Sequence, residues 1–436
     1  MERVLLRIED MAKGILSPNK ILELLYILTT YKIMVDFKKE EEYLREPHII
    51  TNYIQNIDIK KLEKNPYFSE LIYQLEPLEI YNLVSKLDID NQEDFIKEII
   101  YYLDDLDFSK DIARGNYKAV TEKFYAIQNW IFNKYSRFNE MASTPDIINA
   151  LLKNILNVKE TETLLDPCIG TGKLALEVGE NAKQIIGQEI NSLSYEIIKI
   201  NMLIANKDNT KIFMGDSLLE NKFKEADVII SNNPFGLRLN RYDNIPLEYL
   251  KWGEPSKSGM DLHFLSLILY YMKDRGAIIS PEGILFKSGK DGEVRKNIIE
   301  ENLIEAVISL PTGIFDYTGI ATSILILNKN KKDNKILMID TKEMFEKIRG
   351  GVTISDEKIK EIIDIFHSKK EVKNISKLMP LEVLSENEYI LTVSRYIIPE
   401  MEEEKIDLKE LSKEVNVIDY EIENLKKEIN KLIEKI

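Results

Sequence analysis

Acidic residues and glycines follow three short apolar runs in the middle of the chain. Asp166 ends "TLLD" and is followed by Gly170 and Gly172, Glu189 ends "QIIGQE", and Asp216 ends "KIFMGD". Glycines directly after a strand let the backbone approach a ligand closely. An acid about 20 residues further on can accept both hydroxyls of a ribose, and Glu189 lies 23 residues after Asp166. The Asp216 carboxylate could accept a hydrogen bond from an exocyclic amine.

Each of these residues alone also fits a solvated loop or a helix cap, and a lone G-x-G is a weak signal. Three acids at successive strand ends, behind a glycine turn, together predict a nucleotide-like cofactor site. The segment "GTGK" is not a P-loop, because Pro167 stands where that motif needs glycine and Leu174 where it needs Ser or Thr. We therefore exclude nucleoside triphosphate hydrolysis at this turn.

A fourth apolar run, "DVII", ends in Asn232, Asn233, Pro234 and Phe235. An amide oxygen and a backbone carbonyl beside it can accept both N–H bonds of an aminated ring. An aromatic side chain can stack on the face of that ring. These acceptors carry no charge, yet they lower the cost of positive charge on an attacking nitrogen. The turn, stiffened by its proline, therefore predicts a site for a flat aminated ring.

Apolar runs alternate with helix-length stretches from about Thr163 onward, which predicts an α/β domain with a mostly parallel sheet and helices on both faces. Ligands of such sheets bind at the carboxyl ends of the strands, where the residues above fall. Residues 1 to about 137 instead show helical periodicity and predict an all-α domain. Apolar residues near the end of the chain alternate steps of four and three: Leu411, Val415, Ile418, Ile422, Leu425, Ile429, Leu432 and Ile436.

This heptad seam favours packing against a partner helix, as in a coiled coil, over a helix lying on its own domain.

The chain has 436 residues, a net charge of −15 and one cysteine, Cys168. These values predict two or three domains and exclude a disulfide framework and a multi-cysteine metal site. We expect a cytoplasmic location, since we find neither a signal peptide nor a run long enough to span a membrane. The acidity argues against a chain that grips nucleic acid unaided, unless another subunit supplies positive charge or the charge is sorted locally.

The motifs, taken in order, resemble those of the modification subunit of type I restriction–modification systems, an adenine-N6 DNA methyltransferase that uses S-adenosylmethionine. The resemblance covers most of the chain and rests on "STPDIINALL", "DPCIGTG", "INMLIAN", "GDSL", "SNNPFG", "GAIISPEGILF", "EVRKNI", "ISLPTGIFDYTGIATSILIL" and "SRYI". It implies a class I, Rossmann-like methyltransferase domain at 138–400. It also implies a helical domain at 1–137 and a docking helix at 401–436.

The resemblance also implies roles for single residues. The methionine end of the cofactor would be lined by Thr144, Pro145, Asp166, Gly170 and Gly172. Glu189 would hold the ribose of the cofactor and Asp216 its adenine amine. In the turn, Asn232 would supply the catalytic amide, residue 233 its carbonyl, and Phe235 a stacking face for the flipped adenine of the target.

Two residues depart from the family pattern. Asn233 replaces the first proline of the catalytic turn, and Ser143 replaces an aromatic residue before Thr144. Only the carbonyl of residue 233 is needed for the chemistry, so asparagine can substitute, although the turn loses stiffness. Asn233 is also the best support for a second interpretation, a catalytically silent binding module. A third, methylation of RNA or protein, is disfavoured by the motif order and by "SRYI".

The implied reaction is direct methyl transfer to an adenine in double-stranded DNA, without a metal. A separate specificity subunit, docked on the last helix, would read the site, and a restriction subunit is a further possible partner. Cys168 is interpreted as packing. The three histidines, which are far apart in sequence, are interpreted as surface or packing residues, with His263 in the core. Five basic residues are equally consistent with phosphate contacts and with solvated loops: Arg238, Arg241, Lys287, Lys290 and Arg295.

Overall fold

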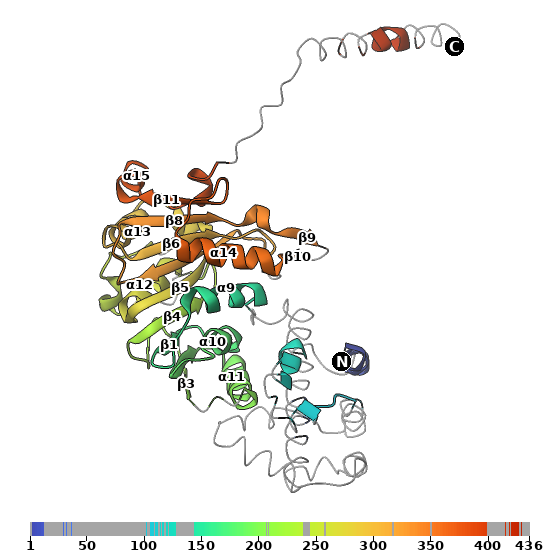
Figure 1. Cartoon of the computed structure of the whole chain (residues 1–436), viewed down its shortest axis with the longest axis vertical. Coiled ribbons are helices and arrows are strands. Elements are labelled where there is room, and N and C mark those ends of the chain that lie inside the picture. The colour runs from blue at the N-terminus through green and yellow to red at the C-terminus, as the bar shows by residue number, and fades with distance from the viewer. Residues whose placement is uncertain are drawn as a thin grey trace. The chain divides into compact units, whose positions relative to one another are not determined.

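Figure 1 shows the protein as a computed structural model. The structure describes residues 2–12, scattered positions from 29 to 127, and 144–398 apart from 206, 208, 239–244, 257–258, 316–317 and 349–350. It also describes 415, 418, 420–426 and 429. Packing divides the chain into two units, Met1–Ile397 and Ile398–Ile436. Among the described residues, no helix is both long enough and apolar enough to cross a bilayer.

The first unit is built on a nine-stranded sheet with the order β11-β8-β6-β7-β5-β4-β1-β2-β3. Its strands are β1 (Thr163–Asp166), β2 (Gln184–Glu189), β3 (Thr210–Met214), β4 (Ala226–Asn232), β5 (Met272–Pro281), β6 (Ile304–Ser309), β7 (Thr322–Asn328), β8 (Lys335–Asp340) and β11 (Ser376–Pro380). Strands β3, β2, β1, β4 and β5 run parallel, as do β6 and β8. Strand β7 lies antiparallel between β5 and β6, and β11 pairs antiparallel with β8. The expected α/β fold with a mostly parallel sheet is confirmed.

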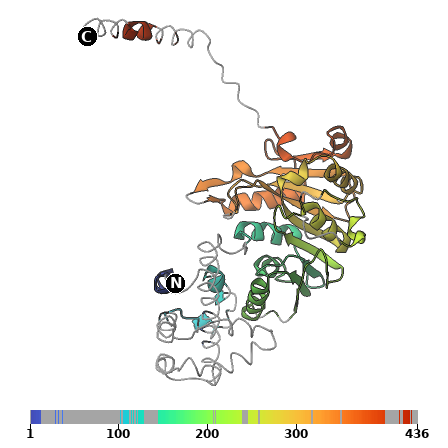
Figure 2. The same ribbon diagram turned by 180° about the vertical axis from the view of Figure 1, so that it is seen from behind.

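Helices cover both faces of this sheet, as the opposite views in Figures 1 and 2 show. One face packs against α9 (Asp146–Leu156), α10 (Lys173–Val178), α11 (Ser192–Ile204) and α14 (Asp356–Ser368). The other packs against α12 (Asp261–Tyr271), α13 (Lys290–Glu300) and α15 (Leu381–Glu386). Neighbouring residues of β4 alternate between the two cores, with Ile229 on one side and Val228 and Ile230 on the other. This alternation follows from the two-residue period of a strand and explains why the strands are apolar throughout.

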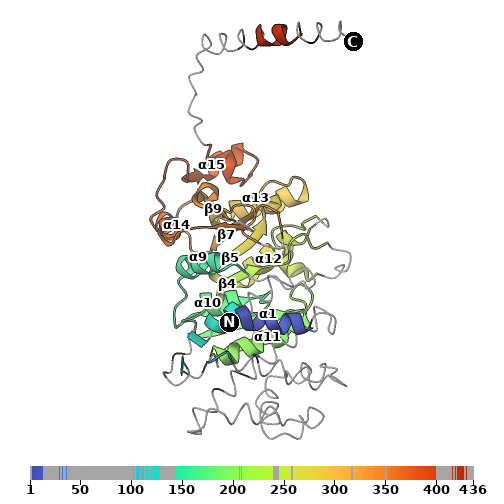
Figure 3. The ribbon, with the colours of Figure 1, turned by 90° about the vertical axis from the view of Figure 1, so that its right-hand side faces the viewer.

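Two smaller pieces complete the described chain. A hairpin of β9 (Glu346–Ile348) and β10 (Gly351–Thr353) precedes α14. Helix α1 (Glu2–Ala12), which Figure 3 shows most clearly, buries Leu5 and Ile8. Most of residues 1–137 lie outside the described part, so the predicted boundary of a helical domain at 137 stays a prediction.

Within the second unit, described positions from 415 to 426 are helical. The seam residues described there are exposed: Val415, Ile418, Ile422, Leu425 and Ile429. The remaining seam positions, Leu411, Leu432 and Ile436, lie outside the described residues. The exposed apolar row is what a helix without its partner would show.

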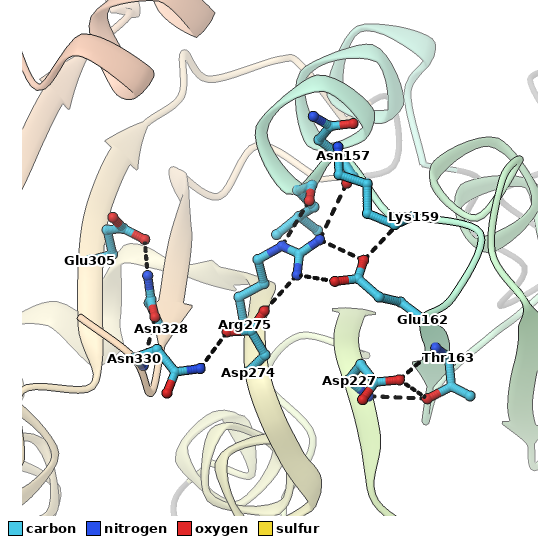
Figure 4. A network of polar contacts seen from close by, with 11 residues as sticks. Asn157, Lys159, Glu162, Thr163, Asp227, Asp274, Arg275, Glu305, Asn328 and Asn330 are labelled. Atoms are coloured by element: carbon cyan, nitrogen blue, oxygen red, sulfur yellow. Dashed lines mark hydrogen bonds and ion pairs between the residues drawn. The ribbon is translucent and has the colours of Figure 1, made fainter.

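Arg275 joins three segments at the amino edge of the sheet (Figure 4). Its guanidinium donates two bonds of 2.8 Å to the carboxylate of Glu162, and its Nε donates to the carbonyl of Leu156 at 2.8 Å. It also donates to Asn157 and Asp274. The hydrogen bonds with Arg275 lower the pKa of Glu162, and those with Glu162 raise the pKa of Arg275. The network fastens the end of α9 to β1 and β5 at the edge opposite the predicted site.

Replacing Arg275 with methionine should lower the free energy of unfolding by about 2–3 kcal/mol, because it strands a partly buried Glu162 and two carbonyls. The matched control is Lys251→Met, which breaks an exposed ion pair with Glu301. That change should cost less than about 1 kcal/mol. Urea denaturation of both variants measures the difference. Equal losses of unfolding free energy in the two variants would show that the Arg275 network stabilises the chain no more than a surface ion pair does.

Candidate active site

The carboxyl ends of β4, β1, β2 and β3 lie side by side, since these strands are consecutive neighbours and all parallel. Asp166 ends β1 and Glu189 ends β2, while Asp216 follows β3 by two residues. The charges of all three acids act on the thiol of Cys168 and, together with burial, raise its pKa well above the usual value. The structure therefore gathers the three predicted acids around one turn.

The glycine turn after β1 is held by the acids themselves. Glu189 accepts hydrogen bonds from the backbone N–H groups of Gly170, at 2.8 Å, and Asn191, at 2.7 Å. Asp166 accepts one from the N–H of Cys168 at 2.9 Å. Each carboxylate oxygen can accept more than one bond, so these contacts leave capacity for a ligand.

The two glycines of the turn serve different purposes. Both have a left-handed backbone, with φ of +56° at Gly170 and +82° at Gly172. A Cβ on Gly172 would lie 1.6 Å from Cδ1 of Ile198, so this glycine lets α11 pack closely against the turn. A Cβ on Gly170 would meet nothing within 4 Å. Of the two, Gly170 is the one with open space beside its backbone for a ligand.

Asp216 lies in a loop that is tied back to the glycine turn. Its Oδ1 accepts from the N–H of Leu218 at 2.9 Å, and the hydroxyl of Ser217 donates to the carbonyl of Pro167 at 2.5 Å. Beside the acids, Ile190 and Met214 are exposed apolar side chains at the ends of β2 and β3. Sequence reasoning missed these two residues, although an apolar residue at a strand end was a visible signal. Their position suits the face of a planar base.

In the turn that follows β4, the structure distinguishes Asn232 from Asn233. Strand β4 ends at Asn232, whose Nδ2 donates to the hydroxyl of Thr144 at 3.0 Å. Its Oδ1 is buried and finds no partner in the described part of the chain. The bond to Thr144 thus engages the donor end of the amide and leaves its acceptor for a substrate.

The side chain of Asn233 is only 2% exposed, and neither end of its amide meets a partner among the described residues. Leaving such groups unpaired costs about 1–3 kcal/mol each. The burial of this side chain leaves the backbone carbonyl as the group of residue 233 that remains a candidate for contact with a ligand. Phe235 lies edge-on to Phe315, with ring centroids 5.7 Å apart at 88°.

The Thr-Pro segment is placed by the start of α9. Pro145 precedes the helix, and Thr144 is buried beside Asn232. The next residue, Asp146, forms an ion pair with Lys173, which is itself buried in the first turn of α10. Sequence reasoning had assigned no role to this pair. It anchors the segment that carries Thr144 to the helix that follows the glycine turn.

Burial sets the electrostatics of the site. It raises the pKa of Asp166 to about 8, and the charge of Glu189 contributes to that increase. Burial likewise raises the pKa of Glu189, although backbone hydrogen bonds oppose it. A positive charge nearby would stabilise the ionised form of these buried acids. The edge is therefore suited to a cationic ligand.

Basic residues near the site divide into two groups. Arg295 is 4% exposed and donates to the carbonyls of Tyr389, Ile284 and Lys287. Its role is therefore structural, and the interpretation of Arg295 as a phosphate contact is wrong. Lys290 pairs with Glu254 at 3.0 Å. Arg238 and Lys287 are exposed, and Arg241 lies outside the described residues.

No cluster of three potential metal ligands occurs within the described part of the chain. His263 is buried in α12, and burial lowers its pKa, in keeping with a packing role. Cys168 is a free thiol that contacts the core beneath the sheet. Neither His263 nor Cys168 belongs to the candidate site residues that lie at the carboxyl ends of the strands.

The mostly parallel sheet, the glycine turn and the acids at its carboxyl edge define a class I, S-adenosylmethionine-dependent methyltransferase fold. The family model described as N-6 DNA Methylase matches residues 123–405, well over half of the chain. The chain belongs to this family.

Relatives and a solved structure agree with this assignment. The type I restriction enzyme MjaVIII methylase subunit of Methanocaldococcus jannaschii is 28% identical, over 96% of this chain and 76% of its own length. The MjaVII methylase subunit of the same organism is also 28% identical, over 81% of this chain. The match spans 64% of the MjaVII subunit, less than two thirds of its length. The type I restriction–modification methyltransferase subunit from Streptococcus thermophilus shares the fold, with a TM-score of 0.73 and 20% identity over 91% of this chain and 98% of that one.

The contribution of Asp166 to the stability of the chain should fall as pH rises between about 4 and about 8. Asp166 stays protonated in the folded chain up to about pH 8 but ionises near pH 4 when unfolded, so folding loses free energy across this window. The slope contributed by this residue is at most about 1.4 kcal/mol per pH unit. Asp166→Asn should flatten the profile measured by urea denaturation at several pH values.

Asp227→Asn is the control for this measurement. Although burial opposes it, hydrogen bonds from Thr163 lower the pKa of Asp227, so this residue does not titrate in the same window. Its variant should keep the slope of the wild type. Identical slopes for Asp166→Asn and the wild type would contradict the raised pKa of Asp166.

Proposed function

We propose that this chain is a site-specific adenine-N6 DNA methyltransferase, acting as the modification subunit of a type I restriction–modification complex. The observation that carries the proposal is the amide of Asn232. Its donor end is engaged by Thr144 and its acceptor end is buried without a described partner, at a strand end beside the glycine turn. An acceptor held in this way suits the N–H of an aminated ring.

The residues at the strand ends fit S-adenosylmethionine. Asp166 would face its cationic methionine end, with Thr144, Pro145, Gly170 and Gly172 around it. Glu189 would accept from the ribose hydroxyls, and Asp216 from the adenine amine, between the apolar side chains of Ile190 and Met214. When bound, the cofactor supplies an electrophilic methyl group on a sulfonium.

The chain's own contribution to the transfer is orientation and charge stabilisation. Asn232 Oδ1 and the carbonyl of Asn233 accept the two N–H bonds of the target amine, which directs the nitrogen lone pair at the methyl carbon. The lone pair of the target amine would form the new N–C bond to the methyl group that the bound cofactor supplies, with the thioether form of the cofactor as the leaving group. The amine nitrogen then releases one proton to solvent. Pro234 holds the turn, and Phe235 stacks on a base that has left the duplex at a cost of a few kcal/mol.

Exchanging each asparagine of the turn for alanine tests this assignment. Asn232→Ala should lower the methylation rate by at least about 10²-fold, as loss of one preorganised polar group does, while cofactor affinity stays nearly unchanged. Asn233→Ala keeps the backbone carbonyl and removes two unpaired buried atoms, so it should keep most of the rate. Transfer of radiolabelled methyl groups to DNA, with a co-expressed specificity subunit, measures both. A tolerated Asn232→Ala with an inactive Asn233→Ala would refute the alignment of the turn.

The second unit supports a partner in this function. Its exposed seam is an apolar stripe suited to another helix. The net charge of −15 argues that a partner brings positive surface to the DNA. We infer that a specificity subunit docks on residues 401–436 and reads the target sequence, in the cytoplasm where its DNA lies. A restriction subunit would join the same complex.

Polar substitutions along the seam should weaken the complex with the specificity subunit. Ile418→Ser with Leu425→Ser removes two of its exposed apolar residues, whereas Glu421→Ser with Glu423→Ser changes the same helix outside the seam. Only the first pair, or removal of residues 411–436, should reduce co-purification of the two subunits. Undiminished complex formation after that removal would rule out docking at this helix.

A silent binding module is the second candidate, and the unpaired amide of Asn233 favours it. Such a protein would keep the cofactor site and the DNA complex but transfer no methyl group. Cofactor binding without methylation by the wild-type complex would select this candidate. Intact placement of Asp166, Glu189, Asn232 and Phe235 favours the enzyme.

A further inference from the structure

Lys173 is a buried cation directly beside the glycine turn. It is the first residue of α10, immediately after Gly172, and it is only 5% exposed. Burial makes its ammonium costly, and positive charge at the amino end of a helix is unfavourable as well. A well-packed hydrophobic side chain often stabilises such a position as much as an ion pair does. Stability alone therefore does not explain why a lysine follows the glycine turn.

Two groups from other segments hold the ammonium of Lys173. Its Nζ forms an ion pair with Oδ1 of Asp146, the first residue of α9. It also lies 5.6 Å from the centroid of the buried Tyr125 ring, within the range of a cation–π interaction. The backbone beneath is fixed too, because the buried Asn201 of α11 donates to the carbonyl of Thr171 at 2.7 Å. The lysine is thus anchored at its base in the glycine turn, and its charged end is bound to α9.

A short and stiff link joins Asp146 to the amide of Asn232. Only Pro145 separates Asp146 from Thr144, and the proline ring holds φ of that residue at −59°. The buried Thr144 accepts a hydrogen bond of 3.0 Å from Nδ2 of Asn232 through its hydroxyl. A displacement of Asp146 would therefore be passed to Thr144, and from there to Asn232. The contacts run without a gap from the glycine turn to the turn that follows β4.

A second ion pair joins the same two segments further along the chain. Lys153, in the last turn of α9, pairs with Glu180, which follows α10 by two residues. Both pairs join residues 27 apart in sequence, and the two helices pack against each other. The side chains of Lys153 and Glu180 are 40% and 46% exposed, whereas that of Lys173 is 6% exposed. Of the two pairs, Asp146–Lys173 is the one beside the glycine turn and Thr144.

We propose that Lys173 is a positioning residue for methyl transfer, whose ion pair with Asp146 aligns the glycine turn with the amide of Asn232. The inference rests on the proposed function, because it assigns the glycine turn to the methyl donor and Asn232 to the target adenine. Lys173 acts through Asp146 and Thr144, not through a contact with the reacting atoms. A direct transfer depends on this alignment of donor and acceptor.

The test measures methyl transfer by the full chain with its specificity subunit at saturating S-adenosylmethionine. Asp146→Ala removes the partner of Lys173 at a side chain that is 68% exposed, so the chain should fold, with a lower Tm. Misplacing reacting groups by about 1 Å costs about 10²-fold in rate, so kcat should fall by about 10-fold to 10²-fold. KM for DNA should stay within about 3-fold of wild type, because alignment of the reacting atoms affects kcat rather than DNA binding. Lys173→Met breaks the same pair without leaving a buried charge unpaired, and should lower kcat similarly.

A second substitution separates positioning from a general loss of stability. Thr144→Val keeps the shape of the side chain but removes the hydroxyl that Asn232 engages. If Lys173 acts through Thr144, adding Asp146→Ala to Thr144→Val should lower kcat by less than about 3-fold, far less than Asp146→Ala does alone. A role in stability alone would instead give independent effects that multiply in the double variant.

Glu180→Ala is the matched control, because it breaks the other ion pair between the same segments. It should keep the wild-type kcat per folded molecule. An unchanged kcat in either Asp146→Ala or Lys173→Met would overturn the inference alone. So would an equal fall of kcat in Glu180→Ala, or independent effects of Asp146→Ala and Thr144→Val. A wild-type complex that methylates no adenine would overturn the proposed function, and the inference with it.

Discussion

The parallel pairing of β4, β1, β2 and β3 is the constraint on which the site depends. Parallel strands end at the same edge, so four loops separated by tens of residues in sequence meet there. The pairing places the turn of Asn232 next to the turn of Asp166, and Asp166 next to Glu189. A donor of a methyl group and its acceptor can then be bound by adjacent strands. The relative placement of these turns is therefore set by the backbone hydrogen bonds of the sheet rather than by any single side chain.

The same edge shows the energetic cost of keeping a site ready for ligands. Asp166, Glu189 and Asp261 are acids whose pKa values are raised by burial. The amides of Asn232 and Asn233 add buried polar atoms without described partners. Each of these features lowers the stability of the free protein. A cationic cofactor has the charge and donors that would relieve Asp166 and Glu189, and an aminated base has the donor that would relieve Asn232.

The strand ends could be predicted from the sequence because they depend on local patterns. Apolar runs predicted the strands, and the acids and amides directly after them predicted the edge where they now lie. What failed depends on contacts between distant segments. Arg295 looked like a loop cation, yet three carbonyls from other elements enclose it. The sequence pattern had already distinguished Asn232 from Asn233, but it did not reveal that Thr144, 88 residues earlier in the chain, engages the amide of Asn232.

The Arg275 network has a consequence for how this protein could change over time. Its hydrogen bonds are satisfied and lie at the amino edge of the sheet, whereas the unpaired amides of Asn232 and Asn233 and the buried acids Asp166 and Glu189 lie at the carboxyl edge. Stability and reactivity are thus carried by opposite ends of the same strands. Substitutions that strengthen the amino edge could compensate for destabilising changes in the turn without altering its geometry. Such compensation would let the chain accept substitutions in the turn that follows β4 and still fold.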